Sequence, residues 1–126
     1  MVIIYYNKSD ASSKRALKWM DIHQIVYQSY PIKKISKKDL VKILSMTEKG
    51  IEEILKKNCS FQNQEKIKKL YKMNINDGLC YLTIHPELLC TPIIFSDNKI
   101  LIGYNEVEIR QFIPRAKRYI FNKGLI

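Results

Sequence analysis

The sequence predicts one α/β domain in which a block of helices interrupts a small sheet. Three observations lead to this fold class. Residues 2–30 have the pattern of a strand, a helix and a second strand, and residues 36–88 carry apolar stripes at helical spacing. Residues 92–114 then give two short apolar runs and a closing helix. A chain of 126 residues is long enough for one compact domain, and no repeat or linker divides it.

The N-terminal part is expected to be a strand-helix-strand unit with parallel strands and a right-handed crossover. Val2–Tyr6 is β-branched and aromatic, which is typical of a buried strand. Three polar residues are competent caps for the helix that follows: Ser9, Asp10 and Ser12. That helix is expected to end near His23, and Ile25–Tyr30 alternates as a second strand that Pro31 closes.

The middle third is expected to be helical and basic. Ser36–Asp39 is a capping box with Asp in place of the usual Glu, and Gly50 breaks the helical run that it opens. Further helices are expected from about Phe61 and from about Asn76, the second of them ending at His85–Pro86.

The last third returns to strand. Two apolar runs flank a polar turn and predict a hairpin: Pro92–Phe95 and Lys99–Ile102. Asn105–Glu108 is a capping box that opens a final helix, which Pro114 stops. Residues 115–126 form a basic tail.

Composition narrows the class of protein. There are 22 Lys and Arg residues against 12 Asp and Glu, which gives a net charge of +10. Such a surplus favours an acidic partner, such as nucleic acid or an acidic protein surface, although solubility in a lysine-rich proteome would also account for it. Cys59, Cys80 and Cys90 are widely spaced, and only His23 and His85 could join them as soft ligands. We therefore expect no metal and no cofactor.

The location is expected to be the cytoplasm. The N-terminus has no basic segment followed by a long apolar run, so it does not have the pattern of a signal peptide. No stretch approaches the length of a membrane span, so no membrane partner is expected. A reducing compartment fits the cysteine usage best.

Strand-helix-strand followed by a hairpin and a closing helix is the thioredoxin-like plan. Residues 1–30 and 92–114 would form its two halves, with about 36–88 as a helical insertion. In this plan the redox cysteines stand in the first loop, as C-x-x-C or as a single cysteine. That loop carries Asp10 and Ser13 here. A carboxylate cannot form a disulfide and a hydroxyl is a poor substitute for a thiolate, so the function is expected to lie in binding. Asp10 is interpreted as a helix cap rather than a general base.

Four segments, taken in this order, resemble the Spx branch of the arsenate-reductase-like (ArsC) family. They are Ile4–Lys14, Leu44–Gly50 with its Met-Thr-Glu-x-Gly core, His85–Leu89 with Thr91–Ile94, and Gly103–Arg115. The resemblance covers nearly the whole chain, from Met1 to about Arg118, and it implies the ArsC-like form of the thioredoxin-like fold. Four segments in the right order are far more specific than any one motif.

This family contains enzymes and regulators. Arsenate reductases use a cysteine nucleophile in the first loop, with arginines holding the oxyanion. Spx-type proteins bind the C-terminal domain of the RNA polymerase α subunit, and most carry a C-x-x-C switch. Here Asp10 and Ser13 replace those cysteines, and Cys90 and Thr91 precede Pro92 where relatives carry arginine. Without a thiolate there is no nucleophile, and without the arginine an oxyanion loses its bidentate donor. The resemblance therefore implies a transcription regulator that is not an enzyme and has no disulfide switch in this loop.

The resemblance places the polymerase contact at Gly50, with Met46, Thr47 and Glu48 beside it. A glycine lets another backbone approach closely, because it has no Cβ. Taken alone, Gly50 is more simply a helix-ending residue. The match of the surrounding Met-Thr-Glu residues favours the contact. Promoter DNA would then be reached indirectly, through the polymerase.

Six lysines lie on or beside the expected central helices: Lys56, Lys57, Lys66, Lys68, Lys69 and Lys72. They could contact promoter phosphates, with Lys56 and Lys57 as the DNA-proximal candidates, or they could form a solvated basic face. No helix-turn-helix, zinc-finger or basic-zipper pattern predicts specific DNA binding by the chain alone. Leu125–Ile126 at the end of the tail is a candidate degradation signal for a protease or a proteolysis adaptor.

Two other functions stay open. Cys80 or Cys90 could serve a thiol oxidoreductase or an arsenate-reductase-like enzyme, since Cys90 stands just before an expected cis-proline. The alternative is that both are small buried hydrophobic residues. The chain could also be a redox-dead competitor that occupies the polymerase site of an active relative.

Overall fold

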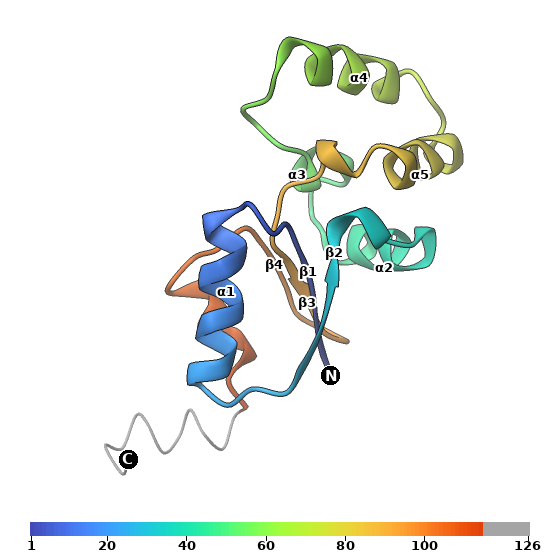
Figure 1. The fold of residues 1–126 in the computed structure, drawn as a ribbon. Helices are drawn as coiled ribbons and strands as arrows, with labels where there is room; N and C mark the ends of the chain where they lie inside the picture. The colour runs from blue at the N-terminus through green and yellow to red at the C-terminus, as the bar shows by residue number, and fades with distance from the viewer. Residues whose placement is uncertain (115–126) are drawn as a thin grey trace.

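A four-stranded mixed sheet forms the centre of the molecule in the computed structural model, which describes residues 1–114 (Figure 1). The strands stand in the order β2 (Tyr27–Pro31), β1 (Val2–Tyr6), β3 (Ile93–Phe95) and β4 (Ile100–Ile102). β1 and β2 run parallel, whereas β3 is antiparallel to both β1 and β4. The predicted α/β class and thioredoxin-like plan are confirmed. The basic tail and Leu125–Ile126 lie outside the described residues.

Helix α1 (Ala11–Ile22) packs on one face of the sheet and begins where the sequence predicts. Asp10 is its N-cap and accepts a hydrogen bond from the Ser12 N–H at 3.2 Å. β2 begins two residues later than predicted, because the Ile25 N–H donates to the Met20 carbonyl at 3.0 Å. Gln24 has a φ of 56°, which is the left-handed conformation that ends many helices. Ile25 is therefore part of the helix end rather than of the strand.

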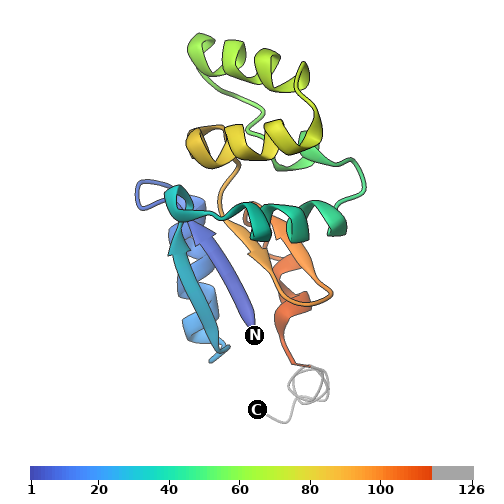
Figure 2. The ribbon, with the colours of Figure 1, turned by 90° about the vertical axis from the view of Figure 1, so that its right-hand side faces the viewer.

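Four helices separate the two halves of the sheet. They are α2 (Lys37–Met46), α3 (Ile51–Ile54), α4 (Phe61–Tyr71) and α5 (Ile75–Ile84). Ser36 caps α2 as predicted, accepting from the Asp39 N–H at 3.1 Å. The Asp39 carboxylate accepts a hydrogen bond from the Tyr5 hydroxyl, which ties α2 to β1. Figures 1 and 2 show α5 between α4 and α2, with α4 at the outer end of the molecule.

Two cores lie on opposite faces of the sheet, as the alternation along each strand requires. Ile4 and Ile94 face the core under α1, together with the fully buried Met20. Tyr5 and Phe95 face the core under the helical block. Each helix that covers the sheet is therefore fixed by burial of an apolar face.

Residues 1–114 also contain short 3₁₀ turns: η1 (Ile32–Lys34), η2 (Pro86–Leu88) and η3 (Glu108–Phe112). The Thr91–Pro92 peptide bond is cis, as predicted. The predicted final α-helix is wrong in type. The Asn105 side chain does cap the turn, accepting from the Val107 and Glu108 N–H groups at 2.9 Å each. Only about two turns fit between this cap and Pro114, so the short run adopts a 3₁₀ turn instead.

Candidate functional site

The segment between α2 and α3, residues 46–50, is here called the Gly50 segment. Met46 is half-buried against the core of the helical block, and Thr47 closes the end of α2 by donating its hydroxyl to the Leu44 carbonyl at 2.8 Å. Glu48 is exposed. Gly50 has a φ of 74° and a ψ of −141°, and a Cβ built there would have no atom within 4 Å beyond its chain neighbours. Gly50 is therefore half-buried, with open space on the side where a Cβ would stand.

Glu53 organises this segment, although sequence reasoning did not single it out. Its Oε2 accepts hydrogen bonds from the backbone N–H groups of Glu48 at 3.0 Å and Lys49 at 3.1 Å. Glu53 is three residues after Gly50, the N-cap of α3. A glutamate at this third position is the residue that reaches back in a capping box, so the spacing was a usable signal.

The first loop is closed by a polar network. The Asp10 Oδ2 accepts from the Ser13 hydroxyl at 3.1 Å and from the Thr91 hydroxyl at 2.8 Å. The Ser13 hydroxyl also accepts from the Asn7 N–H at 3.1 Å, and the Ser13 residue is only 1% exposed. The structure thus brings together the two residues at the redox-loop positions and the residue before the cis-proline. Each polar side chain in this buried site has a partner, as stability demands.

The cysteines are free thiols, and neither candidate resembles an activated nucleophile. Burial raises the pKa of the Cys90 thiol, and the nearby Asp10 charge raises it further, while Lys56 and Lys57 oppose the shift. A raised pKa leaves little thiolate at neutral pH. Cys80 is exposed on α5 rather than placed in the first loop, and nothing in the described residues ties it to Cys90.

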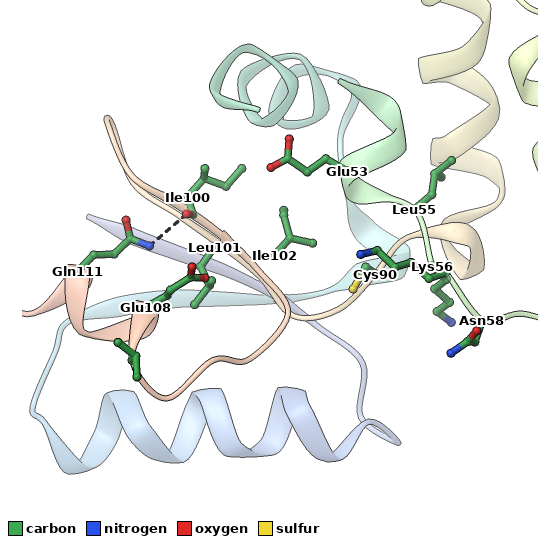
Figure 3. A pocket seen from close by; sticks show the side chains of 12 residues that line it. Glu53, Leu55, Lys56, Asn58, Cys90, Ile100, Leu101, Ile102, Glu108 and Gln111 are labelled. Atoms are coloured by element: carbon green, nitrogen blue, oxygen red, sulfur yellow. Dashed lines mark hydrogen bonds between the residues drawn. The ribbon is translucent and has the colours of Figure 1, made fainter. Parts of the chain in front are cut away.

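Cys90 opens onto a groove of about 1040 Å³ between α3, the β3–β4 hairpin and η3 (Figure 3). Lys56, Lys57 and Asn58 line one part of this groove, and Gln111 lines another. Gln111 donates its side-chain amide to the Ile100 carbonyl at 3.1 Å, so it covers part of the exposed edge of the sheet. Lys56 and Lys57 therefore belong to the α3 side of the groove, a few residues from the Gly50 segment.

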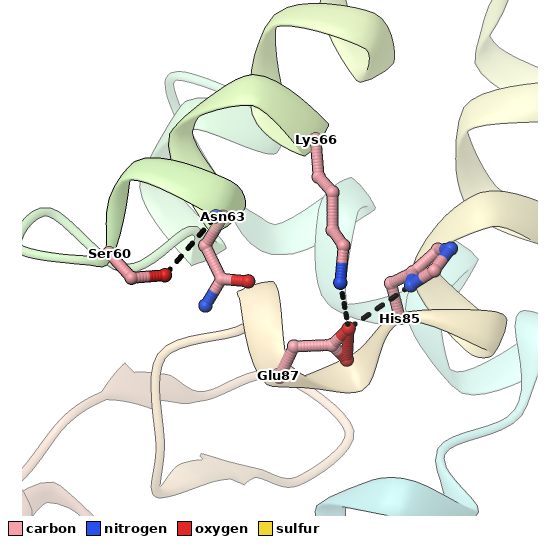
Figure 4. A network of polar contacts seen from close by, with 5 residues as sticks. All are labelled: Ser60, Asn63, Lys66, His85 and Glu87. Carbon is pink, nitrogen blue, oxygen red and sulfur yellow. Dashed lines mark hydrogen bonds and ion pairs between the residues drawn. The ribbon is translucent and has the colours of Figure 1, made fainter.

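The lysines of α4, and Lys72 just after it, differ in their surroundings. Lys66 donates to Glu87 at 3.2 Å, and the same carboxylate oxygen lies 3.1 Å from His85 Nδ1 (Figure 4). Burial alone would raise the pKa of Glu87, but its own backbone N–H, Lys66 and His85 together lower it. Lys68 pairs with Glu65 at 3.2 Å. Lys69 and Lys72 are exposed, so the six lysines do not form one uniform surface.

No group of three or more His, Cys, Asp or Glu side chains within residues 1–114 is placed to hold a metal ion. In the same part of the chain, no helix has the length and apolar character needed to cross a membrane.

The fold and the first loop together define a class: a thioredoxin-like domain with a helical insertion, in which hydrogen-bonded Asp, Ser and Thr side chains occupy the usual redox position. The family model for the ArsC family matches residues 5–112. The chain belongs to the ArsC family.

Within this family the chain is similar to transcriptional regulators. It is 34% identical over 125 residues to the "Global transcriptional regulator Spx 2" of Bacillus cereus, covering 97% of this chain and 94% of the relative. It is 32% identical over 120 residues to the "Global transcriptional regulator Spx" of Bacillus subtilis, covering 94% and 91%.

Solved structures support the fold alone. A structure described as "a possible arsenate reductase" from Streptococcus mutans UA159 is similar with a TM-score of 0.69 at 19% identity, covering 83% of this chain and 92% of that one. The same fold therefore also occurs in proteins described as enzymes, and the choice between regulator and enzyme must rest on the site.

Proposed function

We propose that this chain is a cytoplasmic transcription regulator of the Spx type that acts by binding, not by catalysis. It binds the C-terminal domain of the RNA polymerase α subunit through the Gly50 segment: Gly50 with Met46, Thr47 and Glu48. The observation that carries the proposal is the open space beside Gly50, where no described atom beyond its chain neighbours lies within 4 Å of the Cβ position. The similarity to Spx regulators over almost the whole chain supports the choice of partner.

The first loop in this proposal has no disulfide switch. Asp10, Ser13 and Thr91 satisfy one another by hydrogen bonds, and none of them can be oxidised to a disulfide. Output would therefore depend on the amount of protein or on another signal, such as turnover by a protease. Promoter DNA would be approached through the polymerase, with Lys56 and Lys57 supplying charge attraction that does not depend on sequence.

The surroundings of Cys90 do not favour the enzyme alternative. Cys90 is half-buried with a raised pKa beside the Asp10 carboxylate, and a negative charge at that position repels an oxyanion. A redox-dead competitor would bind in the same way as a regulator. Transcription assays with and without an active relative would distinguish repression by competition from activation.

The test is titration calorimetry against the purified α C-terminal domain, with and without a thiol reductant. We expect about micromolar binding that is the same in both conditions. Gly50→Arg is expected to weaken it by about 100-fold or more, because a long charged side chain would stand where the partner backbone approaches. No binding by the wild-type protein in either condition would reject the proposal.

Gly50→Ala is the matched control, because the conformation of Gly50 is unfavourable for any residue with a Cβ. Strain of this kind costs about 1–3 kcal/mol of stability. Both variants therefore share the strain, but only arginine adds bulk. If both lose binding equally, the glycine is needed for its backbone conformation and not for close approach of the partner.

A further inference from the structure

The Gly50 segment is held by hydrogen bonds to Glu53, a residue outside the segment. Glu48 and Lys49 point into solvent, and Gly50 has no side chain. The two consecutive N–H groups of Glu48 and Lys49 instead converge on one oxygen of Glu53, at 3.0 and 3.1 Å. A carboxylate that accepts from backbone N–H groups makes stronger hydrogen bonds than a neutral acceptor does.

The backbone around Glu53 is held in place by burial and hydrogen bonds. The next residue, Ile54, is fully buried, and its carbonyl accepts from the Cys90 N–H at 2.8 Å. The Lys56 N–H donates to the Leu88 carbonyl at 2.9 Å, so α3 is joined on its C-terminal side to the chain leading into β3. The Glu53 N–H donates to the Gly50 carbonyl at 3.1 Å. Residues 48–53 therefore form a closed loop, and among the described residues Glu53 supplies the only charged group that is hydrogen-bonded to its backbone.

A segment of this kind needs a fastening if it is to bind a partner. Glycine is the residue with the widest backbone freedom, so an unfastened Gly50 would take up many conformations. Ordering them on binding would weaken affinity. We propose that Glu53 is a positioning residue, which holds the Gly50 segment in its partner-binding conformation before the partner arrives. This inference rests on the proposed function of that segment.

The chain offers a matched control in the neighbouring residue. Glu52 has the same charge and lies on the same short helix, but it is exposed and makes no hydrogen bond to the Gly50 segment. Glu52→Ala therefore removes one negative charge but keeps the hydrogen bonds from the Glu48 and Lys49 N–H groups to Glu53. Glu53→Gln keeps one acceptor oxygen without the charge, whereas Glu53→Ala removes both.

The experiment has two measurements on the full chain. Amide hydrogen exchange by NMR reports the Glu48 and Lys49 N–H groups in the free protein, and calorimetry reports affinity for the α C-terminal domain. We expect Glu53→Ala to accelerate exchange at these two amides and to weaken binding by about tenfold, with Glu53→Gln in between. Glu52→Ala should leave exchange at both amides unchanged, and thermal unfolding should show that all three variants are folded.

Unchanged exchange in Glu53→Ala would overturn the inference, as would faster exchange with unchanged affinity. Failure of the wild-type protein to bind is a different result, because it rejects the proposed function. The exchange rates would then decide by themselves whether Glu53 holds the segment. The two proposals can therefore fail separately.

Discussion

The first loop and the Gly50 segment differ in whether their polar groups are hydrogen-bonded to one another or exposed to solvent. At the first loop, Asp10, Ser13 and Thr91 turn their side chains toward one another. At the Gly50 segment, Glu48 is exposed and space is open beside the half-buried Gly50. The first region is closed and internally satisfied, whereas the second is open and held by one carboxylate.

This difference bears on where the function lies. In the thioredoxin-like plan the first loop is where redox chemistry takes place, and here its polar groups are occupied with holding α1 against the cis-proline segment. A side chain that is hydrogen-bonded in this way contributes to stability. The Gly50 segment has the opposite character, since exposed backbone next to fixed secondary structure suits a binding surface. The comparison therefore favours binding over catalysis, and three experiments test it.

The largest effect is expected from Asp10→Ala. This change removes the N-cap of α1 and leaves the buried Ser13 hydroxyl without its acceptor. Loss of the cap and of a buried hydrogen-bond partner together should lower the free energy of unfolding by about 2–3 kcal/mol. Urea denaturation measures this, and affinity for the α C-terminal domain should stay within about threefold, because the Gly50 segment is separate.

Thr91→Val is the graded control for this prediction. It removes one hydrogen bond to Asp10 while leaving the cap and Ser13 in place. The expected loss is about 1 kcal/mol. A fall in partner affinity as large as the fall in stability, in either variant, would show that the two regions are not independent.

A smaller effect is expected on the reactivity of the Cys90 thiol. This reactivity tests how accessible the surroundings of the first loop are. One variant retains only Cys90 and another retains only Cys80, with serine at the other cysteine positions. Because burial and Asp10 raise the pKa of Cys90, less Cys90 thiolate is present at a given pH, and its reaction with Ellman's reagent should be slower than that of the exposed Cys80. The pH profile of Cys90 should also be displaced upward.

Asp10→Asn in the background with only Cys90 supplies the control. Removing the negative charge should lower the pKa of Cys90 and speed the reaction, since Asp10 is one of the causes of the shift. Equal rates for Cys90 and Cys80 would contradict the closed description and reopen the enzyme alternative.

The sequence was sufficient where the signal was local. The caps at Asp10 and Ser36 each rest on a side chain within three residues of the N–H that it accepts from, so the pattern alone located them. The order of strands and helices followed from periodicity in the same way. The end of α1 near His23 was also predicted, but the start of β2 was placed two residues early, because a left-handed Gln24 carries no strong signal of its own.

Contacts across the fold could not be obtained in this way. Asp10 and Thr91 are 81 residues apart, and only the sheet brings the cis-proline segment to the start of α1. The closing turn illustrates a different limit. Asn105 was a correct local signal for a cap, but only about two turns fit before Pro114, and the run is a 3₁₀ helix. The candidate site was therefore predicted as a set of positions. The spacing of Glu53 from Gly50 was a usable signal, but the structure was needed to show its hydrogen bonds to the Glu48 and Lys49 N–H groups.

The smallest effect is expected from the ion pair between Lys66 of α4 and Glu87 of η2 (Figure 4). η2 belongs to the part of the chain that joins the two regions. The pKa of Glu87 is lowered by folding from its ordinary 4.5, so its carboxylate form is favoured in the native state. Its contribution to stability is thus present above pH 4.5 and is lost as the pH falls below that value. Because Glu87 is 40% exposed, solvent screening should keep the loss of stability to about 0.5 kcal/mol or less.

Glu87→Gln should remove this part of the acid dependence in urea titrations from pH 7 to pH 3, while partner affinity at pH 7 stays unchanged. A change in affinity would mean that η2 transmits the position of α4 to the Gly50 segment, and the separation between the two regions would then be incomplete.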